Sequence, residues 1–367
     1  MKIALLAARN SIHTVRWANG LAARGYKVHL ITAHHGGDKL DDRVQVYPLL
    51  FRAPVGYYLN VVHFKMLLRK IQPDILHAHY ASGYGTLGRL SRFHPYILSV
   101  WGSDVYDFPL KSPVNRWIVI KNLQAADWVC STSVTMAEQT RRLCPSVKNL
   151  TVTPFGIDIE VFSPRRELKD PSVITVGTVK KLAPKYGVDV LIRAFSLARE
   201  KLRKHDTASA ERLRLLIVGD GPQRMELEYL TKKLGIDSVT TFVGQVPHRD
   251  VPDYLNRLDV YVAVSRLDSE SFGVAVLEAS ACGLPVVVSD AGGLPEVVKH
   301  GITGYVVERD NVEATADAIM RLVENPSLRN QMGDAGRQHT KTNYNWTDSV
   351  SIMEAVYAKV TKHFGRY

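Results

Sequence analysis

Short apolar runs alternate with longer amphipathic stretches along nearly the whole chain, and this alternation limits the possible folds more than any other feature. A short apolar run is typical of a buried strand, and an amphipathic stretch is typical of a helix with one apolar face. Strands that alternate with helices predict a parallel, doubly wound α/β sheet. In the first half the expected strands are 1–8, 27–33, 44–49, 75–78, 96–100, 128–131 and 149–153, and the expected helices are 14–24, 61–71, 115–125 and 134–143.

A change of composition at 154–171 separates this series from a second one. The segment carries Pro154 and Pro164 and then a charged run, which is typical of a linker. After it we expect strands at 173–178, 213–218, 239–243, 260–264, 285–289 and 304–307, helices at 188–202, 223–234, 251–258, 273–282, 295–298 and 312–322, a polar loop at 206–211, and a last helix from about 348.

The length of 367 residues exceeds that of a usual single domain. We therefore expect an α/β protein of two Rossmann-like domains, 1–165 and 166–347, that face each other across a cleft, with a helix at about 348–367 packed back on the first. Ligands of such sheets bind where the strands end. The stretch from Gly219 to Arg224 lacks the third glycine of a dinucleotide fingerprint, so hydride transfer is disfavoured.

The positive charge is concentrated in the first half. The formal net charge is +11, and residues 1–165 hold 20 Lys and Arg against 10 Asp and Glu. Such a basic surface attracts phosphorylated acceptors or anionic lipid headgroups, although solubilising charge is an equal alternative. Nucleic acid is disfavoured, because no module with interleaved aromatic residues is evident. The three cysteines lack metal-ligand spacing, and no signal peptide or membrane span is apparent, so we expect a cytoplasmic protein.

Two glutamates near the middle of the second half are the best candidates for chemistry. Glu270 lies in an expected loop, and Glu278 lies eight positions later, on the helix that begins near Gly273. Eight positions span about 12 Å along a helix axis, which is comparable to the distance from a hexose to a ribose across a diphosphate. The amides of Ser271, Phe272 and Gly273 at the helix start suit an anion, and Gly273 permits close approach. A solvated Glu278 is less favoured, because its helix is otherwise apolar.

A basic loop follows the first strand of the second half. Lys180 and Lys185 stand where a strand enters the expected cleft, so they can reach a diphosphate and stabilise it as it leaves. A solvated pair of lysines is the alternative.

With these features the chain resembles family 4 of the retaining GT-B glycosyltransferases over nearly its whole length. The motifs that carry the resemblance are Glu270-x7-Glu278 within ESFGVAVLEA, GLPVV at 283–287, GGLPE at 292–296, TPFGID at 153–158 and VGDGP at 218–222. The resemblance implies a GT-B fold and contacts of Glu270 with the donor sugar, of Glu278 with the ribose and of Lys180 and Lys185 with the diphosphate. It also implies donor contacts at Gln245, Val246, Gly177, Gly219 and Val274.

The first half departs from the family pattern in two places. Residues 9–14 replace a Gly-Gly phosphate loop, and Trp101 stands where many relatives have a histidine. Asp104 is a further catalytic candidate, and Ser11, His13, His79 and Trp101 are candidates on the acceptor side. His77 and His79 lack a third ligand and are poor evidence for zinc, so at least one is expected to be a core histidine.

The resemblance implies front-face displacement with retention, in which a leaving phosphate oxygen takes the acceptor proton. It therefore implies an enzyme that needs neither a metal nor another cofactor and that moves a sugar, with UDP favoured over GDP, to a glycan, lipid-linked or phosphorylated acceptor in polysaccharide or glycoconjugate biosynthesis. A non-catalytic sugar-nucleotide-binding partner and another GT-B enzyme, such as an epimerase, are the alternatives. The basic stretches 61–70 and 89–95 are candidates for docking on an anionic membrane, and a core-packed amphipathic helix is the alternative for the first.

Overall fold

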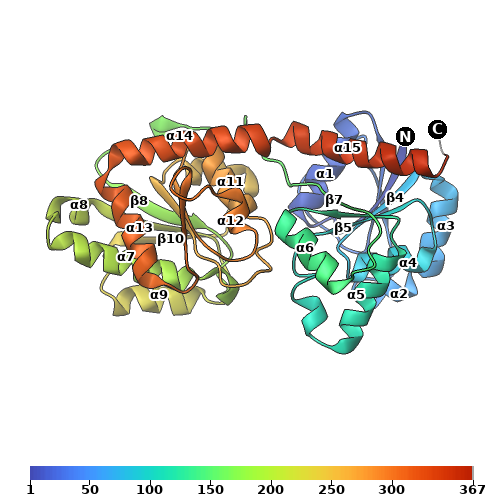
Figure 1. Ribbon diagram of the computed structural model, residues 1–367, viewed down its shortest axis with the longest axis horizontal. Helices are drawn as coiled ribbons and strands as arrows, with labels where there is room; N and C mark the ends of the chain where they lie inside the picture. The colour runs from blue at the N-terminus through green and yellow to red at the C-terminus, as the bar shows by residue number, and fades with distance from the viewer. Residues whose placement is uncertain (366–367) are drawn as a thin grey trace. The chain divides into compact units, whose positions relative to one another are not determined.

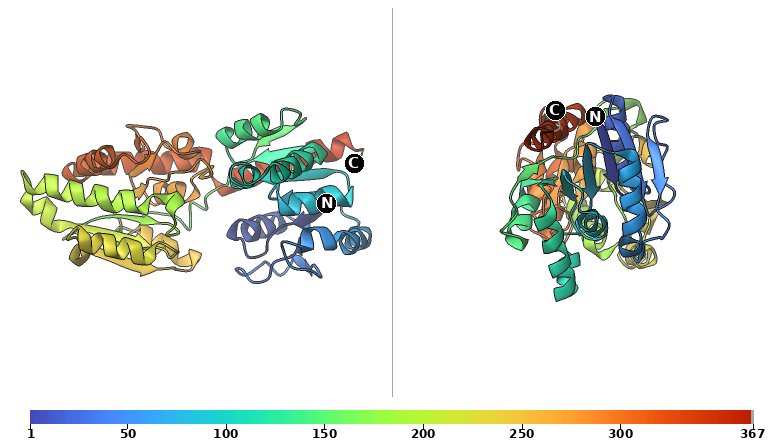
Figure 2. Two further views of the ribbon diagram at one scale, coloured as in Figure 1. Left: turned by 90° about the horizontal axis from the view of Figure 1, so that it is seen from below. Right: turned by 90° about the vertical axis from the view of Figure 1, so that its right-hand side faces the viewer.

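The chain forms two compact units, each of which is a parallel sheet with helices on both faces (Figures 1 and 2). This is a computed structural model, and it describes residues 1–365. Unit 1 takes residues 1–154 and returns at Thr347, and unit 2 is Phe155–Trp346. The chain thus passes from one unit to the other twice.

The sheet of unit 1 has its first strand in the interior. The strands lie in the order β3-β2-β1-β4-β5-β6-β7 and all pair in parallel. The order reverses between β1 and β4, and the crevice at such a reversal is the usual ligand position of a doubly wound sheet. The strands are β1 (Lys2–Leu6), β2 (Lys27–Thr32), β3 (Gln45–Pro48), β4 (Ile75–His79), β5 (Tyr96–Val100), β6 (Trp128–Ser131) and β7 (Leu150–Val152).

Helices from both ends of the chain cover one face of this sheet. Figure 1 shows α15 lying alongside α1, and the Arg24 guanidinium at the end of α1 is 3.1 Å from the Glu354 carboxylate. From within α15, the Tyr357 hydroxyl bonds to Nδ1 of His77 on β4 at 2.8 Å. The helices of unit 1 are α1 (Ile12–Ala23), α2 (Gly56–Leu59), α3 (Val61–Ile71), α4 (Gly83–Ser91), α5 (Pro113–Ala125), α6 (Val134–Leu143) and α15 (Trp346–His363).

The sheet of unit 2 reverses its order in the same way. Its strands lie in the order β10-β9-β8-β11-β12-β13, so the reversal falls between β8 and β11. They are almost entirely buried, which explains the short, continuous apolar runs in the sequence. The strands are β8 (Ile174–Val179), β9 (Leu213–Val218), β10 (Thr240–Gly244), β11 (Val260–Ala263), β12 (Val286–Ser289) and β13 (Gly304–Val307).

Two helix layers enclose this second sheet. Helices α7, α9 and α13 share one apolar core, and α14 packs against α11 on the other face. A Cβ added to Gly333 of α14 would lie 2.1 Å from the Gly283 carbonyl oxygen, so only glycine permits this approach. The helices are α7 (Val188–Arg203), α8 (Thr207–Arg212), α9 (Arg224–Lys233), α10 (Val251–Leu255), α11 (Val274–Ala281), α12 (Leu294–Val297), α13 (Val312–Glu324) and α14 (Pro326–Asn343).

The structure corrects one prediction and adds three helices that were not expected, namely α2, α4 and α14. The polar stretch 206–211, expected as a loop, is the start of helix α8, because the Asp206 carboxylate caps it by accepting a hydrogen bond from the Ser209 amide at 3.0 Å. Helix α14 has no counterpart among the expected elements. In the expected linker, Ile157 forms an isolated bridge with Asn345, and 166–168 form a short 3-10 turn.

Candidate active site

The two strands that flank the reversal in unit 2 bring a lysine and a glutamate together. Lys180 directly follows β8, and Glu270 lies in the loop after β11. The Lys180 Nζ is 2.9 Å from the Glu270 Oε1, and each side chain is only 10% exposed. Two groups that are 90 residues apart in the sequence therefore form one nearly buried ion pair at the usual ligand position of this sheet.

This pair keeps the lysine charged. Burial alone would lower the pKa of Lys180, but the Glu270 carboxylate and two nearby tyrosines, Tyr261 and Tyr186, outweigh burial and raise that pKa above its usual value. The Lys180 ammonium also lies 5.0 Å from the centre of the Tyr186 ring, and that of Lys185 lies 5.4 Å from it on the same loop. Two lysine cations thus make cation–π contacts with the same tyrosine ring at the strand end.

An arginine that the sequence analysis missed ties the two loops of this edge together. The Arg266 amide donates to the Lys185 carbonyl at 2.8 Å. Its guanidinium donates to both oxygens of Asp189, at 2.7 and 2.8 Å, and is 2.5 Å from Asp310. The charge-assisted hydrogen bonds of the Arg266 guanidinium therefore hold the lysine loop and the Glu270 loop to each other. Arg266 carries no local sequence signal, because its partners are distant in the chain.

Glu278 is buried on α11 and has a histidine partner. Its Oε1 is 2.9 Å from the Nε2 of His248, and its side chain is 7% exposed. His248 comes shortly after β10, so a third strand of the same sheet edge contributes to the site. The sequence analysis missed His248, although its position just past a strand end was a usable signal.

The segment between the two glutamates is held by a pair of glycines. Ser271, Phe272 and Gly273 are buried, Val274 is half-buried, and Gly273 takes a φ of +92° that favours glycine. The Gly293 amide donates to the Glu270 carbonyl at 2.9 Å, and a Cβ on Gly293 would lie 2.3 Å from the Ser271 carbonyl oxygen. The GG of the 292–296 motif is therefore needed for close backbone packing.

The remaining donor-side candidates differ in their positions. Gly219 has a φ of +136°, and a Cβ there would lie 1.9 Å from the Lys180 carbonyl oxygen, so this glycine lets two loops meet. Gln245 is exposed and Val246 is half-buried, directly after β10. Gly177 instead lies inside β8, where a Cβ would lie 2.3 Å from the Leu216 carbonyl oxygen, and its contacts are those of the sheet.

Aromatic rings gather at the corresponding edge of unit 1. His79 ends β4, and Trp101 follows β5. The centre of the Trp101 ring is 4.5 Å from that of His79 and 5.9 Å from that of His13. His79 is buried, which lowers its pKa well below the usual value, and its Nδ1 has no hydrogen-bond partner within residues 1–365. Ser11 is half-buried at the start of α1 and does not cap it.

Asp104 is fully buried and bonded to the backbone. Its carboxylate accepts hydrogen bonds from the amides of Ala81, Trp101 and Gly102 at 2.6, 3.1 and 2.8 Å. Burial raises its pKa against the opposing effect of these bonds. This geometry fits the fixing of two loops better than contact with a substrate. His77 is the expected core histidine, because its two ring nitrogens lie 2.8 Å from the Tyr357 and Ser99 hydroxyls.

Two family matches span most of the chain. Residues 161–339 match the family described as glycosyl transferases group 1, and residues 2–133 match that described as glycosyl transferase 4-like. The chain belongs to the glycosyl transferases of group 1. This group 1 enzyme has the GT-B fold and transfers a sugar from a nucleotide sugar.

The similarity to known proteins extends over nearly the full length of this chain. The N-acetyl-alpha-D-glucosaminyl L-malate synthase of Bacillus anthracis is 27% identical, over 93% of this chain and 91% of its own. Sucrose-phosphate synthase from Thermosynechococcus elongatus superimposes with a TM-score of 0.85 at 21% identity, over 99% and 100% of the two chains. Alr3699/HepE of Anabaena, solved with UDP and glucose, superimposes with a TM-score of 0.79 at 18% identity, over 98% and 100%.

Residues 1–365 contain neither a cluster of metal ligands nor a helix that could span a membrane. Within residues 1–365, no group of three or more His, Cys, Asp or Glu side chains is arranged to hold a metal ion. No helix in the same range combines the length and the apolar character that crossing a bilayer requires.

Proposed function

We propose that this group 1 glycosyltransferase uses a UDP-sugar and retains the configuration of the transferred sugar. The observation that carries the proposal is the nearly buried Lys180–Glu270 pair at the strand reversal of unit 2, followed on α11 by the buried Glu278. A cation and two carboxylates in this order match the parts of a nucleotide sugar, which are a diphosphate between two groups that carry hydroxyls. The UDP in the Anabaena structure supports uridine as the base.

Each side chain then has one task in the transfer. Lys180 and Lys185 neutralise the diphosphate as the bond to the anomeric carbon breaks and negative charge develops on the leaving group. Glu270 accepts hydrogen bonds from hydroxyls of the sugar, and Glu278, oriented by His248, accepts them from the ribose. A leaving phosphate oxygen takes the proton of the acceptor hydroxyl, so that no protein base is needed. Two lysines at the diphosphate position supply the charge that a metal would otherwise bring.

For the acceptor we propose an anionic or phosphorylated molecule bound to unit 1. The excess of Lys and Arg in residues 1–165 supports this, and the related Bacillus anthracis enzyme is named for a product that contains L-malate, a dicarboxylate. Trp101, which packs at a tilt of 46° against the buried His79 at the carboxyl edge of the sheet, offers an aromatic face suited to a sugar ring. Asp104 would act only by holding the Trp101 loop.

A thermal-shift panel tests the donor part of the proposal. The protein is heated with UDP, GDP and several of their sugars, in EDTA and separately in magnesium. Ligand at a hundredfold excess over its Kd stabilises the folded state by about 2.7 kcal/mol, which is a readily measured shift. We expect a selective shift with one UDP-sugar that is unchanged by EDTA and lost in Glu278→Ala. Glu167→Ala, which removes an exposed glutamate from unit 2, is the matched control and should keep the shift.

Turnover separates the proposal from its two alternatives. A non-catalytic partner would bind the nucleotide sugar without releasing UDP, and an epimerase would change the sugar while it remains attached to UDP. Release of UDP that depends on an added acceptor, with an α-linked donor giving an α-linked product, supports a retaining transferase. An inverted product would contradict the retaining mechanism.

We also propose that unit 1 docks on an anionic membrane through a surface formed by α2, α3 and the segment before them. Asn60 holds Phe51 in place, because its side chain bonds to the Phe51 amide at 3.0 Å and to its carbonyl at 2.7 Å. Helix α3 buries Phe64, Leu68 and Ile71 in the core, as the alternative interpretation required, yet its other face remains apolar. The exposed apolar side chains of this surface are Leu50, Phe51, Val55, Tyr58, Leu59, Val62 and Met66, with Arg52, Lys65, Arg69 and Lys70 among them.

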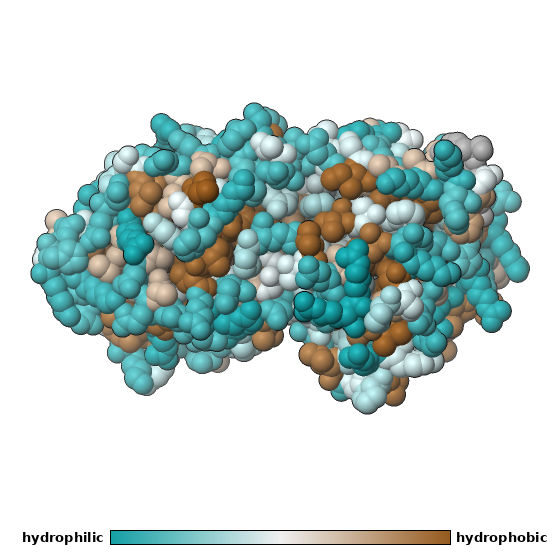
Figure 3. Space-filling model, in the orientation of Figure 1, coloured by the Kyte–Doolittle hydropathy of each residue, from teal (hydrophilic) through white to brown (hydrophobic). Residues whose placement is uncertain are grey.

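A second exposed apolar group lies at the start of α5. Figure 3 shows apolar surface (brown) over the end of unit 1 that residues 108–117 form, where Leu110, Val114 and Trp117 are exposed beside Lys111 and Arg116. Apolar side chains beside basic ones are typical of binding to anionic lipid interfaces.

We expect the protein to float with phosphatidylserine vesicles at low salt. The double variant Val62→Ser/Met66→Ser should weaken flotation, and the control Met225→Ser/Tyr229→Ser, on exposed residues of unit 2, should not. Equal flotation of both variants would contradict this surface.

A further inference from the structure

A large cavity lies at the edge of the unit 1 sheet opposite to the one that carries His79 and Trp101. It has a volume of about 690 Å³, which is within the range of small-molecule sites. Its lining includes Tyr96 and Trp128, the first residues of β5 and β6, and residues near the end of α15. Strand β5 rises about 3.3 Å per residue, so about 13 Å separate Tyr96 from Val100, next to Trp101. The cavity is therefore separate from the carboxyl edge of its own sheet.

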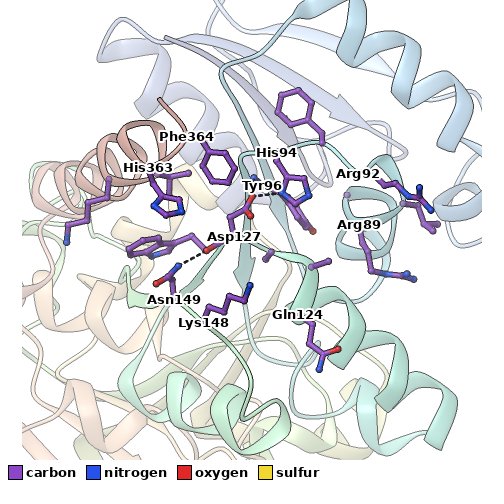
Figure 4. A pocket seen from close by; sticks show the side chains of 18 residues that line it. Arg89, Arg92, His94, Tyr96, Gln124, Asp127, Lys148, Asn149, His363 and Phe364 are labelled. Atoms are coloured by element: carbon purple, nitrogen blue, oxygen red, sulfur yellow. Dashed lines mark hydrogen bonds and ion pairs between the residues drawn. The ribbon is translucent and has the colours of Figure 1, made fainter. Parts of the chain in front are cut away.

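Arginine, lysine and histidine side chains line this cavity on several sides. Figure 4 shows Arg89 and Arg92 on one side, Lys148 below and His363 on the other side, and Lys359 also lines the cavity. Arg89 donates to the Asn122 side chain at 2.8 Å, whereas the exposed Arg92, Lys148 and Lys359 form no ion pair with any residue in 1–365. Three exposed cations that line the cavity are therefore without an ionic partner in the described residues.

Asp127, an acidic residue in the lining of the cavity, already has hydrogen-bond partners within the protein. Asp127 Oδ2 accepts a hydrogen bond from the Tyr96 amide at 2.7 Å and lies 2.7 Å from Nδ1 of His94 (Figure 4). Its carboxylate therefore has hydrogen-bond partners of its own and forms no ion pair with Arg92, Lys148 or Lys359 in residues 1–365. The net field in the cavity favours an anion.

Rings and amides line the space between the cations. The His94 and Phe364 rings lie nearly parallel, 6.4 Å apart at 13°, and Trp128 is half-buried with its indole N–H bonded to Thr151. The exposed side chains of Gln124 and Asn149 offer further donors and acceptors. Flat rings beside amide groups suit a ligand that carries a ring as well as a charge.

The backbone conformation at Arg92 is one that glycine adopts more readily than arginine. Arg92 ends α4 with a φ of +58°, in the left-handed region that glycine prefers at this position. The chain nevertheless places there a long cationic side chain that has no bonded partner in the described residues and lines the cavity. The left-handed end of α4 therefore places a long cationic side chain in the cavity lining, where the glycine that is usual at this position would place none.

We propose that this cavity is a second ligand site, which binds a small molecule with a phosphoryl group attached to a ring. The positive charges of Arg92, Lys148 and Lys359 attract the phosphoryl group, and Trp128, His94 and Phe364 contact the ring. The ring can be the base of a nucleoside diphosphate or the sugar of a sugar phosphate, since both share this chemistry. The site is distinct from the donor site of unit 2, and it does not depend on the proposed function of that site.

Fluorine NMR on protein labelled with 5-fluorotryptophan tests the site directly. Trp128 lines the cavity, and Trp128→Phe identifies its resonance. The probes are UDP, ADP, glucose 1-phosphate and pyrophosphate. We expect a saturable shift of the Trp128 resonance with a nucleoside diphosphate or with the sugar phosphate, and the tighter of the two identifies the source. A Trp128 resonance that no probe moves would overturn the proposal, and equal affinity for pyrophosphate would overturn its ring-binding part.

A charge-removal variant and its matched control complete the test. Arg92→Gly/Lys148→Ala/Lys359→Ala should weaken binding at least tenfold while the Tm is kept, because these side chains have no structural partner and glycine suits the backbone at 92. The control Lys232→Ala/Lys233→Ala/Arg321→Ala removes the same charge from exposed positions of unit 2 and should leave the Trp128 response unchanged. Equal weakening in both variants would mean a response to net charge alone, and it would overturn the site.

Discussion

A double-mutant cycle on Lys180 and Glu270 tests whether their ion pair is buried and strongly coupled. Two unit charges 2.9 Å apart attract each other by about 6 kcal/mol at an effective dielectric constant near 20. Desolvation offsets much of this energy, but removing one partner leaves the other charge buried and unpaired, which costs about 3–5 kcal/mol. We expect Glu270→Gln or Lys180→Met to destabilise unit 2 by about 3 kcal/mol each. The free energy of unfolding that the double variant loses should be much smaller than the sum of the two single losses. The difference, which is the coupling energy of the pair, should be at least about 2 kcal/mol.

Urea unfolding, monitored through hydrogen exchange of the β8 and β11 amides, measures the free energy of unfolding of unit 2. It is measured for the wild type, the two single variants and the double variant. The exposed pair Lys204–Glu200, with an N–O distance of 3.4 Å, gives the control cycle. Its coupling should stay near about 0.5 kcal/mol, as for other exposed helix pairs. A coupling for Lys180–Glu270 that is no larger than this control would refute the reasoning, because it would mean that solvent screens the pair.

Three further predictions concern single side chains. Gly219→Ala should lower the stability of unit 2 by about 1–3 kcal/mol and weaken UDP binding in calorimetry, because its Cβ would collide with the Lys180 carbonyl. His77, whose pKa burial lowers from 6.5 to about 3, stabilises the fold above pH 6.5. That stability is lost as the pH falls toward 3, by about 1.4 kcal/mol per unit, so urea unfolding of His77→Gln at pH 6 and 5 should show a smaller slope than wild type. Asp104→Ala should cost about 3 kcal/mol or more of unit 1 stability in the same assay, and Asp104→Asn less, because it keeps one acceptor oxygen. Equal losses in the two Asp104 variants would contradict this.

The fold was predictable from the sequence to the extent that local patterns determine it. Buried parallel strands leave continuous apolar runs, and most of the expected strands overlap observed ones. The pattern failed where one contact outweighs composition. At α8 a single capping carboxylate starts a helix in a polar stretch. At α14 two glycines disfavour a helix by propensity, and one of them, Gly333, is required by close packing against Gly283, just past the end of α11.

The candidate site was predictable in its parts but not in its pairings. The positions of Lys180 and Glu270 after strands indicated one sheet edge, yet no local signal says that the two side chains touch. The pairings of His248 and Arg266 were not predictable either, because their partners lie 30 and 77 residues away in sequence, although the position of His248 just past a strand end was a usable signal. The environment of Asp104 was likewise hidden, because a buried aspartate that caps loops cannot be told from a catalytic one by residue type.

The hydrogen bond between His77 and Tyr357 has a consequence for the order in which the protein matures on the ribosome. Unit 2 is one uninterrupted stretch, so all of its residues are synthesised before Thr347 and the rest of α15. Unit 1 begins emerging first, but one face of its sheet lacks α15 until the chain that follows unit 2 has been made. We therefore expect the first-made half of the nascent chain to be the later half to mature, and to be the part that needs chaperone protection during translation.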